Sequence, residues 1–369
     1  MLIIISGIIV IITLITAYLL IISTGKQEQF LDVGGKPLKG SISEKIFVNI
    51  NGVKQGMFIK SRNEANPVLL YLHGGPGMPE YAISRKYPTV LEDNFTVCYW
   101  EQRGTGLSYD VDGKESEVTF EQLIADTLEV TDYLSERFGQ EKIYLMAHSG
   151  GTFFGIQVAA QSPEKYHAYI AMAQITKQLE SEKLAYSYML DQFEKMGDKK
   201  MLKKLKAIPL LDLNTMPTAY KGIRDEAMHK LGIGTTREMK SVVKGIFLPV
   251  MLSGEYGFRE KINIWRGKWS KNSNNLWNHI LGTDLTQEVT ELNIPVYFCE
   301  GIYDYTCSYS LAKEYFEQIK APTKKFYTFD QSAHSPLFEE PDKMEQVLLE
   351  DILKGEKNEI IIKSSTKGL

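Results

Sequence analysis

A serine in a predicted strand-to-helix turn is the first feature of this chain that could do chemistry. An apolar run of strand length, residues 143–147, leads into a histidine, a serine and two glycines, and a helical pattern begins at Thr152. A serine in such a turn stands above the sheet within reach of a substrate, and small residues two positions before and after it prevent a clash. Ala147 and Gly151 occupy those positions. The pattern predicts Ser149 as a nucleophile, the alternative being a serine that only caps the helix.

A serine hydroxyl needs a general base, which a third group must orient. In folds with this turn the chain order is serine, acid, histidine. Of the six histidines, only His334 follows the last strand-like run, residues 325–330, so it is the predicted base. Asp304 follows the preceding run, residues 295–300, and is the predicted acid, with Asp330 as its competitor.

Backbone N–H donors for an oxyanion are also indicated, because acyl transfer develops negative charge on the carbonyl oxygen. The residue after the nucleophile, Gly150, would supply one donor. The segment His-Gly-Gly-Pro-Gly at 73–77 would supply the second, from Gly75 or alternatively Gly74. This segment lacks the glycine spacing and the lysine of phosphate-binding loops, which disfavours a nucleotide site.

The elements that must position these residues alternate between strand and helix. A helical pattern with a capping box spans 119–138, and Asn51-Gly52 predicts a hairpin turn. The alternation gives way to helical patterns between 175 and 290, then resumes. The sequence therefore predicts an α/β fold with a mostly parallel sheet, interrupted by a helical insertion. The strand-like runs are 67–73, 95–100, 143–147, 167–172, 295–300 and 325–330.

Together these motifs resemble the proline iminopeptidase (prolyl aminopeptidase) family of α/β-hydrolases over about residues 45–355. The resemblance implies the α/β-hydrolase fold with a helical cap, and a serine peptidase that removes an N-terminal residue, often proline, from short peptides. It also implies that Gln102 and Arg103 pack under the segment 73–77, here called the oxyanion loop, with Arg103 paired internally. The motifs are His73-Gly74-Gly75-Pro76-Gly77, Trp100-Glu-Gln-Arg-Gly-Thr-Gly-Leu-Ser108 and Ala147-His-Ser-Gly-Gly151, with Asp304 and His334 in matching order.

The chain departs from the family pattern in two motifs. Glu101 stands where the family usually has Asp, and the serine turn reads Ala-His-Ser-Gly-Gly where the family usually has Gly-Gly-Ser-Trp-Gly. The second departure removes an indole near the serine, so it bears on proline preference more than on hydrolysis.

An aminopeptidase must bind a protonated amine, and acidic side chains of the insertion could do so. Glu182 and Glu255 are the predicted ligands, with Glu180 and Glu260 as further candidates. Trp265 is a candidate substrate contact, although its i, i+4 spacing to Trp269 also suits packing within the cap.

Composition excludes several other classes of protein. The chain has 369 residues with 42 Lys and Arg against 46 Asp and Glu, a formal net charge of −4, which argues against nucleic-acid binding. Its three cysteines, Cys98, Cys299 and Cys307, are too few and too scattered for a disulfide framework or a zinc cluster. We therefore predict no metal and no cofactor.

The N-terminus carries 22 consecutive uncharged positions, residues 2–23. As a helix this stretch would be about 33 Å long, enough to cross a bilayer core of roughly 30 Å. A cleaved signal peptide is the alternative, but no basic residue precedes the run. We predict a single-pass membrane protein with an extracytoplasmic catalytic domain. The predicted units are an anchor (1–25), a stalk (26–44), a core (45–174 and 291–357) and a cap (175–290).

The predicted function is hydrolysis of a short peptide by a Ser-Asp-His triad through an acyl-enzyme. A carboxylesterase or lipase-like hydrolase of small esters would use the same triad and is the first alternative. A non-catalytic binding protein on a hydrolase scaffold is the second, although such a protein would usually have lost a triad member. The expected partners are a small peptide or ester substrate and, through the N-terminal helix, a membrane.

Overall fold

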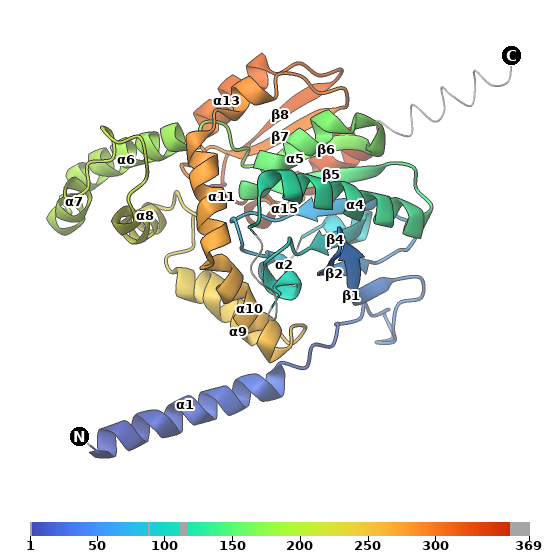
Figure 1. Ribbon diagram of the computed structural model, residues 1–369, viewed down its shortest axis with the longest axis horizontal. Coiled ribbons are helices and arrows are strands. Elements are labelled where there is room, and N and C mark those ends of the chain that lie inside the picture. The colour runs from blue at the N-terminus through green and yellow to red at the C-terminus, as the bar shows by residue number, and fades with distance from the viewer. Residues whose placement is uncertain (1, 88, 111–116, 355–369) are drawn as a thin grey trace, which may run out of the picture.

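An eight-stranded sheet forms the centre of the computed structural model, which describes residues 2–87, 89–110 and 117–354 (Figure 1). The strands are β1 (Ile42–Ile50), β2 (Val53–Ser61), β3 (Val68–Leu72), β4 (Thr96–Trp100), β5 (Ile143–His148), β6 (Tyr166–Met172), β7 (Val296–Gly301) and β8 (Lys324–Phe329). Their order is β1-β2-β4-β3-β5-β6-β7-β8. The β1–β2 and β2–β4 pairs are antiparallel, and the remaining pairs are parallel. The mostly parallel sheet predicted from the sequence is confirmed.

The hairpin turn and the helix ends predicted from the sequence are present in the structure. Asn51 (φ 48°) and Gly52 (φ 75°) form the turn between β1 and β2, in the left-handed conformation that such hairpins require. Thr119 caps α4 (Phe120–Phe138) by accepting a hydrogen bond from the Gln122 amide, and Gly139 ends the helix at φ 63°.

Both faces of the sheet are buried, which explains the continuous apolar runs. Successive residues of a strand point to opposite faces. In β5, Ile143, Leu145 and Ala147 pack against α4, α5 and α13, whereas Tyr144 and Met146 belong to the cluster with α2, α3, α15 and η4. These helices are α5 (Gly150–Gln161), α13 (Tyr309–Gln318), α2 (Tyr81–Ser84), α3 (Leu91–Asn94), α15 (Pro341–Val347) and the π-helical η4 (Leu348–Ile352).

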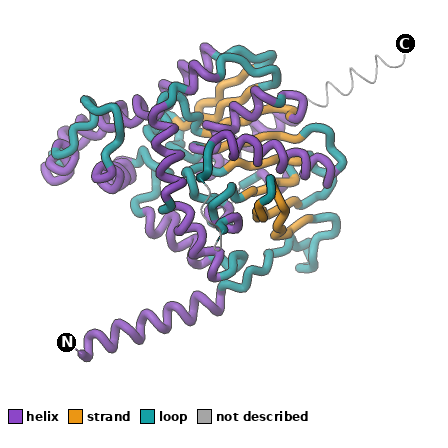
Figure 2. Tube along the Cα trace, viewed as in Figure 1, coloured by secondary structure: helices purple, strands orange, loops and turns teal. Residues whose placement is uncertain are grey.

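A helical insertion separates β6 from β7 along the chain, and its helices appear among the purple segments of Figure 2. It has a hydrophobic cluster of its own, which includes Met189, Phe193, Tyr220 and Met228. We call this insertion the cap. Its helices are α6 (Gln178–Lys195), α7 (Lys199–Lys206), α8 (Thr218–Leu231), the π-helical η3 (Val243–Phe247), α9 (Leu248–Leu252), α10 (Phe258–Lys268), α11 (Lys271–Gly282) and α12 (Leu285–Glu288).

Helix α1 (Leu2–Ile22) extends away from the body beside α9 and α10 (Figure 1). Its segment Ile5–Ile22 is long and apolar enough to cross a membrane and is not buried against the rest of the chain. Of the predicted boundaries, residue 1 and residues 355–357 lie outside the described residues.

The segment 26–44, expected to be a stalk, is fastened to the body instead. The Gln27 side-chain amide donates to the Glu255 carbonyl (3.1 Å), and the Glu28 amide donates to the Glu255 carboxylate (2.8 Å). The last residues of this segment already belong to β1. The expected stalk is thus part of the folded domain, because its backbone finds partners in the cap.

A buried carboxylate joins the β1–β2 hairpin, the exit of β4 and helix α4. Asp126 is fully buried and accepts two hydrogen bonds from Arg103, at 2.7 and 2.8 Å. It also accepts from Gln55 (2.8 Å), Asn51 (2.9 Å) and Gln122 (2.9 Å). Removing this carboxylate would leave the Arg103 guanidinium, which is nine-tenths buried, without its ion-pair partner.

We predict that Asp126→Ala lowers the free energy of unfolding by about 3–5 kcal/mol, because one half of a buried ion pair is left uncompensated. The matched control is Asp132→Ala on the same helix, which removes an exposed ion pair with Lys165 and should cost less than about 1 kcal/mol. Denaturant unfolding followed by circular dichroism measures both. Equal losses for the two variants would contradict the prediction.

Candidate active site

Ser149 lies in a strained turn between β5 and α5. Its backbone has φ 52° and ψ −123°, a conformation that residues other than glycine rarely adopt. The small neighbours are required sterically: a Cβ on Gly151 would lie 2.5 Å from the Leu72 carbonyl oxygen. Among the described residues the Ser149 side chain makes no hydrogen bond, and Ser149 lines a cavity. Its hydroxyl is therefore available to a ligand.

Asp304 and His334 come together at the carboxyl ends of β7 and β8. The Asp304 carboxylate is buried and accepts the Nδ1–H of His334 at 2.8 Å. Its other oxygen accepts the amides of Thr306 (2.7 Å) and Cys307 (3.0 Å), which fixes its orientation. Asp304 thus holds the tautomer in which His334 Nε2 is the free nitrogen, and His334 lines the same cavity as Ser149.

The two candidate oxyanion donors lie close together. A Cβ on Gly150 would be 3.2 Å from the backbone nitrogen of Gly75, so the two glycine backbones are in near contact. The Gly74 amide already donates to the Glu80 carboxylate at 2.9 Å. It is thus occupied, which favours Gly75, a residue at φ 123°, over Gly74 as the second donor.

The sequence analysis missed a buried ion pair formed by His148, the residue that precedes Ser149. His148 lies 2.9 Å from Glu80 through Nδ1 and donates from Nε2 to the His334 carbonyl at 2.7 Å. Burial by itself would raise the pKa of Glu80, but the charge of His148 and hydrogen bonds from His148 and Tyr71 lower it to about 2. Burial opposes the charge of His148, yet Glu80 raises its pKa above the usual value. The His-Ser dipeptide was the only signal of this pair, and it does not identify the partner.

The remaining motif residues hold the oxyanion loop in place through hydrogen bonds and close packing. Burial lowers the pKa of His73 to about 4, so its ring is neutral, and it donates from Nδ1 to the Gly74 carbonyl. Gln102 binds His73 twice, from its backbone amide (3.2 Å) and its side-chain amide (2.9 Å). Gly77, at φ 78°, lies so near the cap that a Cβ would be 3.0 Å from the Gly267 carbonyl oxygen. Pro76, in the same loop, lines the cavity that contains Ser149.

Glu101 is an internal carboxyl group that connects the core to the cap. It is buried, accepts a hydrogen bond from the Leu107 amide and a short one from the Tyr256 hydroxyl, and lies outside the cavity lining. Burial raises its pKa to about 8, so it is mostly neutral at pH 7.

The cavity has a volume of about 490 Å³ and lies between the core and the cap. The core contributes Gly75, His148, Ser149 and His334 to its lining. The cap contributes apolar and aromatic side chains together with a similar number of polar and charged ones. These cap residues include Met216, Met228, Val242, Ile246, Trp265, Trp269, Trp277, Lys221, Arg224, Asp225 and Lys268.

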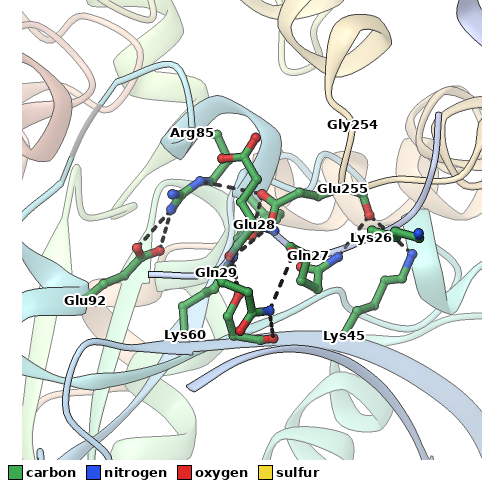
Figure 3. A network of polar contacts seen from close by, with 12 residues as sticks. Lys26, Gln27, Glu28, Gln29, Lys45, Lys60, Arg85, Glu92, Gly254 and Glu255 are labelled. Atoms are coloured by element: carbon green, nitrogen blue, oxygen red, sulfur yellow. Dashed lines mark hydrogen bonds and ion pairs between the residues drawn. The ribbon is translucent and has the colours of Figure 1, made fainter. Parts of the chain in front are cut away.

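The structure places only one of the three predicted substrate contacts, Trp265, in this cavity. Glu182 is fully buried in an ion pair with Arg224 (2.6 Å). Glu255 lies in a separate polar network near the N-terminal segment, where it binds Lys60 (2.8 Å) and the Glu28 amide (Figure 3). Both carboxylates are occupied by other chain groups, so neither is free to bind an amine.

The acid of the cap that does line the cavity, among the described residues, is Asp225. It forms one ion pair, with Arg224 at 3.0 Å, and its side chain is 55% exposed. Lys268 also lines the cavity, and burial lowers its pKa. No group of three His, Cys, Asp or Glu side chains placed to hold a metal ion is present in the described part of the chain.

Comparisons with known proteins agree with this geometry. A family model for the alpha/beta hydrolase fold matches residues 67–216. The chain is 29% identical over 308 residues to the "Probable aminopeptidase YbaC" of Bacillus subtilis (strain 168), covering 83% of this chain and 95% of that protein. It is 32% identical over 126 residues to the "Proline iminopeptidase PfmaB" of Pestalotiopsis fici, covering 34% and 41%.

Solved structures show the same fold. The crystal structure of the proline iminopeptidase of Mycobacterium smegmatis superposes with a TM-score of 0.57 at 16% identity, covering 84% of this chain and 98% of that one. At such low identity the likeness concerns the fold alone, and the aminopeptidase relative adds a resemblance over most of the chain. The chain therefore has the α/β-hydrolase fold and resembles the proline iminopeptidases.

Proposed function

We propose that this protein is a serine aminopeptidase that acts on short peptides. The observation that carries the proposal is that the strained Ser149, the oriented His334 and Gly75 line one cavity, with Gly150 in near contact with Gly75. A serine, a base held by a buried acid and two backbone donors are the parts that acyl transfer requires.

The proposed reaction follows from the positions of these groups. His334 Nε2 accepts the hydroxyl proton as Ser149 Oγ attacks the substrate carbonyl, and the Gly75 and Gly150 amides bind the oxyanion. His334 then donates the proton to the leaving amine, and an acyl-enzyme forms. Water, deprotonated by His334, hydrolyses this ester and restores the serine. Asp304 stabilises the imidazolium in both steps.

Asp225 replaces Glu182 and Glu255 as the proposed site for the substrate's protonated amine. It is an acid on the cavity wall, and its single ion pair leaves part of the carboxylate free. A cavity of about 490 Å³ under a cap suits a short substrate rather than a folded one. The aminopeptidase name of the relative that covers most of the chain supports the same class.

A carboxylesterase remains the second candidate, and one observation favours it. Glu182 and Glu255 are both held in ion pairs, so among the described acids of the cap amine recognition would depend on Asp225. An ester substrate needs no such acid and would use the same serine.

We also propose that α1 anchors the protein in a membrane, with the catalytic domain on the extracytoplasmic side. The length and apolar composition of α1 support the anchor, as does its exposure along the described helix. A chain with a membrane-spanning helix at its N-terminus more often sends its body outward.

We predict that Ser149→Ala lowers kcat by a factor of about 10⁵–10⁶, because it removes the nucleophile from a group of residues that act as a unit. A fluorescent alkylphosphonate should label the wild type at Ser149 and leave the variant unlabelled, as read by peptide mapping. Circular dichroism should show the same fold for both. Near wild-type turnover, or labelling at another serine, would refute the proposed nucleophile.

We predict that Asp225→Asn raises KM for prolyl and other aminoacyl arylamides about tenfold, the value of one charge-assisted hydrogen bond of about 1.4 kcal/mol. Hydrolysis of p-nitrophenyl butyrate should not change, because this ester carries no amine. Glu226→Gln is the control, since this neighbouring acid is exposed and pairs with Lys204. If the wild type hydrolysed only the ester, the proposed peptidase activity would be wrong and the esterase alternative would stand.

A further inference from the structure

One stretch of the cap exposes a row of large apolar side chains. Val243–Leu252, formed by η3 and α9, is a short apolar helix. Five residues in or directly before it are exposed, with exposed fractions of 37–58%. Outside α1, no other stretch of this length in the described chain exposes more than two large apolar side chains. We call this surface the apolar ridge; it consists of Val242, Val243, Phe247, Leu248 and Leu252.

The apolar ridge is held against the end of α1 by direct contacts. Lys261 donates to the Ser23 hydroxyl (2.7 Å) and to the Met251 carbonyl (2.9 Å), so one ammonium group joins the last turns of α1 and α9. The Gly25 amide bonds the Gly254 carbonyl, and Thr24 forms a bridge with Gly257. If α1 crosses a bilayer, its end lies at the bilayer surface, and these bonds bring the ridge to that surface.

The polar network of Figure 3 prevents this junction from swinging freely. Glu255 accepts the Glu28 amide (2.8 Å) and the ammonium of the buried Lys60 (2.8 Å). Lys45 bonds the Glu255 carbonyl (3.2 Å) and pairs with Glu260 on α10 (2.8 Å). The chain leaving α1 is therefore tied both to β1 and β2 and to the base of the cap.

The surroundings of the apolar ridge match the chemistry of a lipid surface. Lys86, Lys240 and Lys244 are exposed beside it and line an open hollow of about 1170 Å³. Trp269 is 71% exposed and contacts Trp265, which in turn contacts Phe247. Lysines that meet anionic headgroups and tryptophan at the boundary are typical of membrane-interface segments.

We propose that the apolar ridge inserts into the surface of the membrane that α1 spans, so that the cap lies on the bilayer. This inference rests on the proposed anchor but not on the proposed reaction. The partner is the lipid surface itself. Anionic headgroups meet the flanking lysines, and acyl chains meet the ridge.

This placement brings the active-site cavity to the membrane. Val242, directly before the helix Val243–Leu252, and Ile246, within it, line the cavity together with Trp265 and Trp269. The cavity wall and the membrane-contacting surface are thus built from the same helix. A substrate with an apolar tail, held in the bilayer and presenting its cleavable bond at the headgroups, would reach Ser149 along this wall.

The test uses the full-length chain in vesicles of phosphatidylcholine and phosphatidylglycerol. Phe247→Cys is labelled with the fluorophore NBD, and the native cysteines do not interfere because all three are buried. The matched control is Leu184→Cys, an exposed apolar position on α6 of the cap. We expect NBD at position 247 to emit at shorter wavelength and to lose most of its emission to nitroxide lipids, whereas NBD at 184 is unaffected.

Each other outcome overturns the proposal. Equal exposure of both labels to water would place the apolar ridge away from the bilayer. A blue shift at 247 that nitroxide lipids do not quench, and that fades as the protein is diluted in the vesicles, would show a second copy on the ridge. Vesicle flotation separates these results from failure of the anchor, because a chain that does not float with the vesicles has no membrane to contact.

Discussion

The buried Glu80 carboxylate is the interaction on which the candidate site depends. One oxygen accepts the Gly74 amide in the oxyanion loop, and the other accepts the Tyr71 hydroxyl of β3 (2.6 Å). The same carboxylate pairs with His148, which bonds the carbonyl of His334. One anion thus links the oxyanion loop, the turn that carries Ser149 and, through His148, the loop that carries His334. Three loops that follow three separate strands would otherwise need independent means of reaching a common geometry.

Much of the fold could be predicted because its causes are local. Both faces of the sheet are covered, so its strands appear as apolar runs, and Asn51-Gly52 and Thr119 act on their immediate neighbours. The order of Ser149, Asp304 and His334 follows from a sheet whose parallel strands end at one edge. Glu80 could not be found in this way, because its partners come from two different strands, β3 and β5, and no spacing in the sequence encodes them.

The acids predicted to bind an amine show the same limit. Glu182 and Glu255 look alike in sequence, as two glutamates in a helical insertion. Their roles depend on which cation folds against them: Arg224 from α8 in one case and Lys60 from β2 in the other. The segment 26–44 was expected to be a stalk for a related reason, since a polar segment without periodicity gives no sign of distant backbone partners. The Glu28 amide meets the Glu255 carboxylate across more than two hundred residues of sequence.

The cap has two constraints that act on the same helices. Its inner side must enclose a cavity above Ser149, and its base must accept the chain that leaves α1. Helix α10 serves both, because Trp265 and Lys268 line the cavity while Lys261 and Glu260 bind Ser23 and Lys45. One three-turn helix therefore contacts both the chain that leaves α1 and the cavity above Ser149.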